Sequence, residues 1–206
     1  MNSAVIISSS PLPSLANWFS SDTRFLTLYP DFLKPLSTNH WTPLNVARKA
    51  AVFLAAEKGV RILDIGSGMG KFCLAAAYYC PAASYFGIEQ RKDLTECAEA
   101  ARQRLGLNNV SFIHGNIIDL DLSQYNHFYF YNSFYENIAP AGKIDENLPY
   151  SIERYHQYRY FLYRQLEKKP SGTRVATFYG RDEQMPRGYH VGGSDMDDLL
   201  KYWVKE

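Results

Sequence analysis

The segment RILDIGSGMGKF, residues 61–72, limits what this chain can fold into more than any other feature of its sequence. Its first half is a short apolar run typical of a buried strand. Its second half brings glycines at 66, 68 and 70, and glycine permits a left-handed backbone and the close approach of a ligand to the main chain. A strand that passes through such a turn into a helix indicates an α/β fold with a nucleotide or nucleoside site at the turn.

The spacing of the glycines argues against both common phosphate-binding loops. A dinucleotide turn needs GxGxxG, but this chain has GxGxG, with Lys71 where the last glycine belongs. A triphosphate loop needs GxxxxGK followed by Ser or Thr, and here Ile65 and Phe72 occupy the first and last positions of that pattern. Asp64 at the strand end would repel a pyrophosphate and attract an amino group. The turn therefore predicts a nucleoside that carries an amine.

Two later segments supply further contacts for such a ligand. SYFGIEQ ends in Glu89, 19 residues after Gly70, at a strand end where an acid can accept hydrogen bonds from both ribose hydroxyls. The next strand candidate leads into GNIIDL, where Asn116 can offer its amide to an adenine edge and Ile117 can pack on the ring. We expect these strand ends to form one cofactor site.

Beyond residue 41 the sequence alternates strand-like and helix-like segments, the pattern of parallel strands joined by crossover helices. In residues 1–41, four prolines interrupt short apolar stretches, which predicts an irregular leader with short helices. The final two candidate strands are close enough in sequence to pair antiparallel. Strands are expected at 60–65, 84–89, 110–115, 127–132, 172–180, 188–192 and 199–206, and helices at 42–59, 70–80, 91–105 and 149–169.

ILDIGSGMGK, FGIEQ and GNIIDLDL, in this order and spacing, resemble the class I (seven-strand, Rossmann-like) S-adenosylmethionine-dependent methyltransferases. The resemblance covers about residues 42–206 and implies an α/β three-layer sandwich with a mostly parallel sheet. Its strand order would be 3-2-1-4-5-7-6, with strand 7 antiparallel and the cofactor over the carboxyl ends of strands 1–4. Residues 1–41 would then be an N-terminal leader or lid segment, and residues 42–206 the S-adenosylmethionine-binding methyltransferase domain.

The same resemblance assigns the cofactor S-adenosylmethionine to specific residues. The glycine turn would surround its methionine part, Glu89 its ribose, and Asn116 with Ile117 its adenine. The implied cofactor-binding residues are Asp64, Gly66, Ser67, Gly68, Gly70, Glu89, Gln90, Asn116, Ile117 and Asn132.

The acceptor side is indicated by YNSFYEN, which follows the fourth strand. Asn132 and Tyr135 are the candidate catalytic residues, because enzymes that methylate amines of bases or glutamine carry Asn-Pro-Pro-Tyr there. This chain keeps the first and last letters and lacks both prolines, which argues against a base-methylating enzyme. A further resemblance, to non-SET protein-lysine methyltransferases and their bacterial relatives, implies an amine acceptor, with a protein lysine as one candidate. A small-molecule methyltransferase and an inactive cofactor-binding module remain as alternatives.

Bulk composition supplies the remaining expectations. The net charge of +1, from 22 basic and 21 acidic residues, gives no field that would recruit a polyanion or an anionic membrane, so we expect neither nucleic acid nor membrane as a partner. The three cysteines and five histidines share no ligand spacing, so no metal site is predicted, and a reducing cytoplasm fits best. Lys71 is expected in the first helical turn, facing solvent. The sequence leaves the oligomeric state open.

Overall fold

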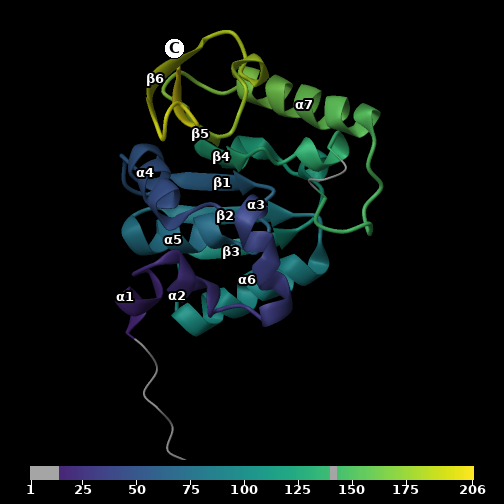
Figure 1. Cartoon of the computed structure of the whole chain (residues 1–206). Helices are drawn as coiled ribbons and strands as arrows, with labels where there is room; N and C mark the ends of the chain where they lie inside the picture. Colours follow the sequence, from purple (N-terminus) through teal and green to yellow (C-terminus); the bar gives the residue numbers. More distant parts are fainter. Residues whose placement is uncertain (1–13, 140–142) are drawn as a thin grey trace, which may run out of the picture.

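The computed structural model describes residues 14–139 and 143–206. At its centre is a seven-stranded sheet in the order β3-β2-β1-β4-β5-β7-β6, which Figure 1 shows as a stack of strands from β6 down to β3. β1 to β5 run parallel, and β7 is antiparallel to both of its neighbours. The predicted strand order and the antiparallel seventh strand are confirmed. The strands are β1 Arg61–Ile65, β2 Ser84–Glu89, β3 Val110–His114, β4 His127–Tyr131, β5 Arg174–Phe178, β6 Tyr189–Asp195 and β7 Leu200–Lys205.

The helices connect and cover these strands, and their ends follow local sequence signals. Gly106, with φ of 66°, ends α6 in a left-handed conformation, and the Ser151 hydroxyl accepts a hydrogen bond from the Arg154 amide to begin α7. The α-helices are α1 Leu15–Trp18, α2 Asp22–Leu26, α3 Ser37–His40, α4 Leu44–Leu54, α5 Lys71–Tyr79, α6 Lys92–Leu105 and α7 Ile152–Glu167. Short 3₁₀ turns are η1 Asp31–Leu36, η2 Ile117–Asp119, η3 Leu122–Gln124, η4 Tyr135–Asn137 and η6 Asp182–Gln184.

The two faces of the sheet are buried against different helices, because side chains alternate along each strand. Ile62 of β1 packs in the core that α4, α5 and α6 share, whereas Leu63 and Ile65 pack in the core that contains α7. Residues of β4 alternate in the same way, with Tyr129 on the first side and Phe128 on the second. A sheet covered on both faces explains why these strands are apolar almost throughout.

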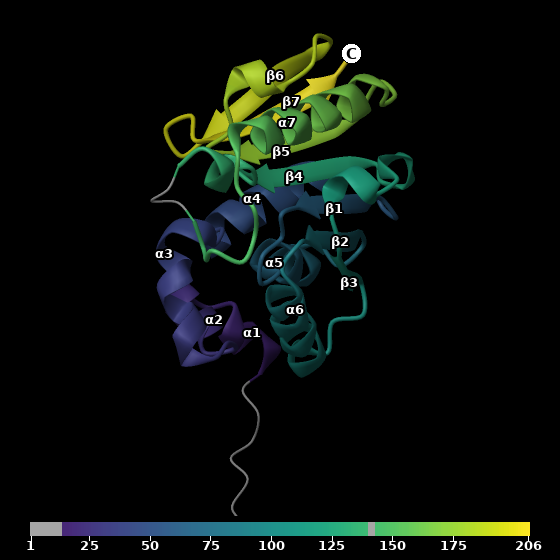
Figure 2. The same ribbon diagram turned by 90° about the vertical axis from the view of Figure 1, so that its right-hand side faces the viewer.

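The N-terminal segment, residues 14–41, is part of the first of these cores. Figure 2 shows α1 and α2 beside α6, and the Arg104 guanidinium of α6 lies 4.8 Å from the Trp18 ring. Phe19 stacks on Tyr78 of α5 with ring centroids 4.1 Å apart. Trp41 is buried against Tyr29, so its side chain packs in the core. Division of the chain at residue 41 remains a prediction.

Two contacts fix this segment to the glycine turn. The Tyr29 hydroxyl donates a hydrogen bond of 2.9 Å to the Met69 carbonyl, and Lys71 forms an ion pair with Asp22. Lys71 is only 5% exposed, so the expectation that it faces solvent is wrong. The segment that buries Lys71 comes from about fifty residues earlier in the chain, and helical position alone gives no sign of it. Among the described residues, no helix is long and apolar enough to cross a membrane.

Candidate active site

A cavity of about 560 Å³ lies at the carboxyl ends of the parallel strands. Its wall includes Ile65, Glu89 and Tyr131, the last residues of β1, β2 and β4. Segments that follow β3 and β5 complete it, through Gly115 and Tyr179. This is the edge at which open parallel sheets bind ligands, and the volume falls within the usual range of small-molecule sites.

The glycine turn forms the floor of this cavity. Gly66, Gly68 and Gly70 all have positive φ, of 72°, 52° and 76°. Gly66 also allows the segment after β4 to come close, because a Cβ at this position would lie 2.8 Å from Ser133 Cβ. The Ser133 hydroxyl donates a hydrogen bond to the Ile65 carbonyl. The exits of β1 and β4 are thereby joined at the cavity.

Glu89 connects the turn to the end of β2. One of its carboxylate oxygens accepts a hydrogen bond of 3.0 Å from the Gly68 amide, and the other accepts one of 3.0 Å from the Arg91 amide. Burial raises the pKa of this carboxyl, and the hydrogen bonds and charge of Arg91 oppose the rise. The carboxylate therefore lies in the cavity wall at the predicted ribose position, with its orientation fixed by two backbone groups.

At the predicted adenine end, Tyr158 of α7 connects two of the predicted residues. The Tyr158 hydroxyl accepts a hydrogen bond from the Asn116 amide at 3.1 Å and lies 3.3 Å from Gln90 Oε1, to which it donates. The Asn116 side-chain oxygen accepts from the Ile118 amide. Asn116 thus supports the segment that carries Ile117, whose side chain lines the cavity.

Asp64 points away from the cavity. Its side chain is 3% exposed and accepts a hydrogen bond from the Cys73 thiol of α5 at 3.7 Å. Burial raises the pKa of Asp64 well above its usual range. The cause is strand alternation, because Asp64 shares its face of β1 with Ile62, under α5. A direct contact of this carboxylate with a ligand remains a prediction.

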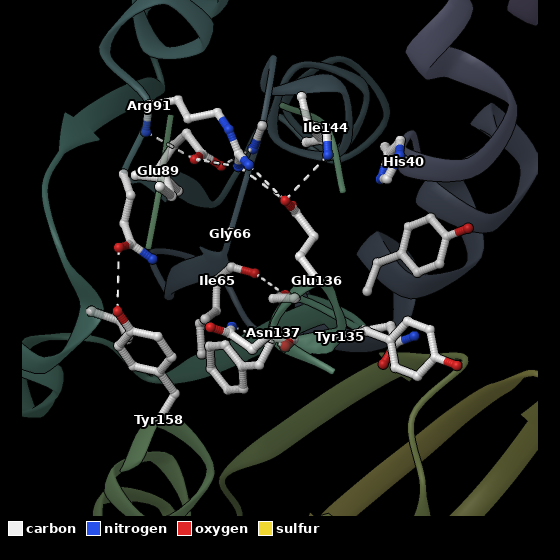
Figure 3. A pocket seen from close by; sticks show the side chains of 18 of the residues that line it. His40, Ile65, Gly66, Glu89, Arg91, Tyr135, Glu136, Asn137, Ile144 and Tyr158 are labelled. Atoms are coloured by element: carbon white, nitrogen blue, oxygen red, sulfur yellow. Dashed lines mark hydrogen bonds and ion pairs between the residues drawn. The ribbon is translucent and has the colours of Figure 1, made fainter. Parts of the chain in front are cut away.

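A buried cluster of charges closes one side of the cavity. The Arg91 guanidinium is 2.5 Å from Glu136 and 2.9 Å from Asp145, and it also contacts the Tyr150 hydroxyl at 2.6 Å. Figure 3 shows Glu136 pointing toward Arg91 and the Ile144 amide. Segment 143–150 is held beside the cavity by these contacts, and Ile144 and Tyr150 belong to the cavity wall.

The opposite side of the cavity is aromatic and open. Tyr135 and Tyr179 are 40% and 49% exposed, and Tyr131 stacks on Tyr179 with ring centroids 5.8 Å apart. Asn132 and Tyr179, which follow β4 and β5, have positive φ of 47° and 56°. Such a backbone is unfavourable for residues with a side chain and is enriched at functional sites. His40 of α3 also reaches this side, as Figure 3 shows, and burial lowers its pKa.

The structure brings most of the predicted residues together. Those in the cavity wall are Gly66, Gly68, Glu89, Gln90, Ile117, Asn132 and Tyr135, whereas Asp64, Ser67, Gly70 and Asn116 lie outside it. Sequence reasoning did not identify His40, Arg91, Glu136, Tyr150, Tyr158 and Tyr179. The one available signal was the acid in YNSFYEN, which follows a predicted strand end. Within residues 14–139 and 143–206, no cluster of side chains suited to a metal ion occurs.

These residues fit S-adenosylmethionine by their chemistry. Gly66 and Gly68 present backbone without side chains, and a Cβ on Gly68 would meet no protein atom within 4 Å, so that part of the floor is open. Glu89 places an acceptor at the middle of the site, and Ile88 and Ile117 provide apolar surface suited to a base. The wall therefore combines open backbone, a hydrogen-bond acceptor and apolar surface, the groups suited to an amino-acid chain, a sugar and a base.

Comparison with known proteins agrees with this reading. The Methyltransferase domain family matches residues 56–135, from the approach to β1 to the segment after β4. The fold is similar to that of an RNA methyltransferase from Salinibacter ruber solved with S-adenosyl-L-homocysteine, at a TM-score of 0.55 and 20% identity over 80% of this chain and 93% of that one. TrmN from Thermus thermophilus gives a TM-score of 0.55 at 16% identity, over 82% of this chain and 50% of that chain.

Curated relatives match part of the sequence. A tRNA (guanine-N(7)-)-methyltransferase of Prochlorococcus marinus is 33% identical over 90 residues, 43% of this chain and 42% of the relative. One from Synechococcus is 49% identical over 55 residues, 27% of this chain and 23% of the relative. A 23S rRNA (uracil(1939)-C(5))-methyltransferase of Enterobacter is 34% identical over 101 residues, 48% of this chain and 22% of the relative. The chain thus spans less than half the length of each of these three curated relatives.

The names of these relatives correct one expectation. Net charge and the loss of the Asn-Pro-Pro-Tyr prolines led us to expect no nucleic-acid partner. The relatives act on tRNA and rRNA, so that expectation is wrong. A net charge averages over the whole chain and says little about the surface around one cavity. The strand order and the glycine turn at the exit of β1 are those of a Rossmann-like fold, and residues 56–135 of that fold match the Methyltransferase domain family.

Proposed function

We propose that this chain transfers a methyl group from S-adenosylmethionine to a nitrogen atom of a nucleobase in RNA. The observation that carries the proposal is the continuity of one cavity from Glu89, at the predicted ribose position, to the exposed rings of Tyr135 and Tyr179. A cofactor bound against the glycine turn would have its reactive end beside the exits of β4 and β5. An acceptor would enter from the open aromatic side.

Each part of the wall has a defined task in this proposal. Gly66 and Gly68 would receive the methionine chain, Glu89 would bind the ribose hydroxyls, and Gln90 with Ile117 would hold the adenine. S-adenosylmethionine supplies a methyl group activated by its sulfonium. The chain itself contributes alignment of the acceptor and exclusion of water, which account for much of the rate in a displacement of this kind.

The open side suits a flat acceptor. Tyr135 and Tyr179 offer exposed aromatic surface, and aromatic side chains bind nucleobases by stacking, at about 1–3 kcal/mol per base. Asn132 also lies in the cavity wall, three residues before Tyr135 in sequence, and its amide can donate or accept a hydrogen bond at a base edge. His40 has its pKa lowered by burial, so its imidazole is neutral near pH 7 and can accept a proton from an acceptor nitrogen.

Local charge supports RNA as the acceptor. Arg159 of α7 borders a small hollow shared with Asn132 and Ser133, next to the open side of the cavity. Basic side chains beside a base pocket are suited to the phosphates that flank the target nucleotide. The RNA-modifying relatives point in the same direction.

The test is methyl transfer from radiolabelled S-adenosylmethionine into a cell lysate that is then separated into RNA, protein and small-molecule fractions. Label in RNA, removed by ribonuclease, is the expected result. Tyr179→Ala should lower this labelling at least tenfold. Tyr160→Ala provides the matched control, because Tyr160 is 69% exposed on α7 and lies outside the cavity wall, and it should leave labelling unchanged.

Other outcomes of this experiment refute the proposal in different ways. Label confined to protein bands would assign a protein side chain as the acceptor, and label in small molecules would assign a metabolite. No label in any fraction, with S-adenosylmethionine binding intact, would leave a cofactor-binding module without transferase activity.

A further inference from the structure

One buried cation holds three carboxylates at the edge of the cofactor cavity. The Arg91 side chain is 6% exposed, and its guanidinium lies 2.5 Å from Glu136, 2.9 Å from Asp145 and 3.7 Å from Glu89. When all three acids are ionised, this group carries two more negative than positive charges. Screening by water is weak at such a site, so the excess acts on whatever binds in the cavity.

Glu136 is, with Glu89, one of the two acids of this cluster that line the cavity. It belongs to η4, just after β4, and its carboxylate accepts hydrogen bonds from the Ile144 amide at 3.3 Å and the Tyr150 hydroxyl at 3.0 Å, besides those from Arg91. In Figure 3, Gly66 is drawn between Glu89 and Glu136. Four donor contacts leave the Glu136 carboxylate little freedom to rotate away.

No second fixed cation in the cavity wall offsets these acids. Among the described residues of the wall, the charged side chains are Glu89, Arg91 and Glu136, together with the titratable His40. Burial lowers the pKa of His40, so this imidazole adds no charge near pH 7. Lys71, although close in sequence to the glycine turn, pairs with Asp22 outside the wall. The cavity therefore has a negative interior.

We propose that Glu136, positioned by Arg91, makes this cavity select the positively charged cofactor over its neutral demethylated product. S-adenosylmethionine differs from S-adenosylhomocysteine by one methyl group and one positive charge, so a fixed carboxylate near the floor favours the first. When the methyl group is transferred, the cofactor loses its sulfonium charge. Its attraction to Glu136 is then weaker, and the product S-adenosylhomocysteine is released faster. The inference rests on the proposed function for the identity of the cofactor, and adds a specificity-determining residue and a positioning residue.

The test is calorimetric titration of the full chain with three ligands at one pH and low salt. They are S-adenosylmethionine, S-adenosylhomocysteine and sinefungin, in which a protonated amine takes the place of the methylated sulfonium. The unaltered chain should bind both cationic ligands more tightly than S-adenosylhomocysteine. Glu136→Gln should weaken binding of the two cations by about tenfold and that of S-adenosylhomocysteine by less than about twofold, as loss of one nearby charge would do.

Two further variants separate charge from fold. Glu146→Gln is the matched control, because the Glu146 side chain is 80% exposed, pairs with Lys143 and lies outside the wall, and it should change no affinity. Arg91→Met removes a positive charge but also frees the Glu136 carboxylate to turn toward water. If the position of Glu136 sets the preference for cations, the preference should fall in this variant, and if the net charge alone sets it, the preference should be kept or increase; thermal unfolding is checked in parallel.

Three results would overturn the inference or its basis. If the unaltered chain binds S-adenosylhomocysteine as tightly as the cationic ligands, the cavity does not select by charge. If Glu136→Gln weakens all three ligands equally, the side chain acts through shape rather than charge. If the unaltered chain binds none of the three, the proposed function fails and the inference fails with it.

Discussion

Gly70 and Gly68 allow the geometry of the glycine turn to be tested by a matched pair of substitutions. Both residues have a left-handed backbone, with φ of 76° and 52°. A Cβ on Gly70 would lie 2.3 Å from Phe112 Cζ and 3.0 Å from Ala98 Cβ, whereas a Cβ on Gly68 would meet nothing within 4 Å. Alanine should therefore cause the same backbone strain at both positions, and a steric clash at position 70 alone.

The expected loss of stability follows from these contacts. Left-handed backbone costs a residue with a Cβ about 1–2 kcal/mol, so Gly68→Ala should lower the free energy of unfolding by about that amount. Gly70→Ala adds the strain of an overpacked core, about 1–3 kcal/mol, because Phe112 lies between β2, α5 and α6 and must move. Gly70→Ala should therefore be the more damaging of the two by about 1–3 kcal/mol.

Urea denaturation followed by tryptophan fluorescence measures this difference, provided that both variants keep the same slope with denaturant. Equal losses for the two variants would refute the steric argument. A double-mutant cycle with Phe112→Leu adds a second check, because a smaller ring should relieve part of the Gly70→Ala cost and none of the Gly68→Ala cost. If the cycle shows no coupling, Phe112 is not the cause of the loss.

Three further substitutions probe the site and its buried charges. Tyr158→Phe removes the hydroxyl that joins Asn116 and Gln90, so affinity for S-adenosylhomocysteine should fall about 3- to 10-fold in calorimetry. Burial lowers the pKa of His127 to about 4. Below pH 6.5 the folded chain therefore binds fewer protons at this imidazole than the unfolded chain does. The free energy of unfolding should fall as pH drops from about 6.5 to 4, by up to about 3 kcal/mol. His127→Gln should flatten that pH profile of urea midpoints. Burial raises the pKa of the Asp64 carboxyl, so its ionisation opposes folding as pH rises above 3.8. Asp64→Asn should therefore gain stability relative to the unaltered chain between pH 4 and 7. A variant that unfolds more readily than the unaltered chain at pH 7 would contradict this.

The elements of the fold followed from the sequence because their signals are local. Each parallel strand is a short apolar run beside a turn, and RILDI and SYFGIE match β1 and β2 to within a residue. The place of Glu89 in the cavity wall also follows from the sequence, because the topology alone defines where the end of the second strand lies. Its contact with the ribose stays a prediction. Asp64 illustrates the limit of motif reasoning, since strand alternation places it with Ile62 under α5 and not in the cavity.

The parts that escaped prediction depend on contacts between distant segments. Glu136 and Arg91 are 45 positions apart, and only the packed structure shows that one guanidinium holds Glu136 and Asp145 together on one side of the cavity. Lys71 is buried by residues about fifty positions earlier. The expectation of no nucleic-acid partner failed for a different reason, because a net charge averages over the whole chain and does not report the surface around one cavity.

Contacts from three distant segments meet at the glycine turn, and they affect how tightly the turn can bind a ligand. Tyr29 donates to the Met69 carbonyl, the Ser133 hydroxyl donates to the Ile65 carbonyl, and Glu89 accepts from the Gly68 amide. The turn is therefore held from the N-terminal segment, from the exit of β4 and from the end of β2. Because its left-handed glycines are ordered during folding, their conformational entropy is lost before binding begins. A turn ordered in this way retains more of its contact energy for affinity than a loop that must order around the cofactor.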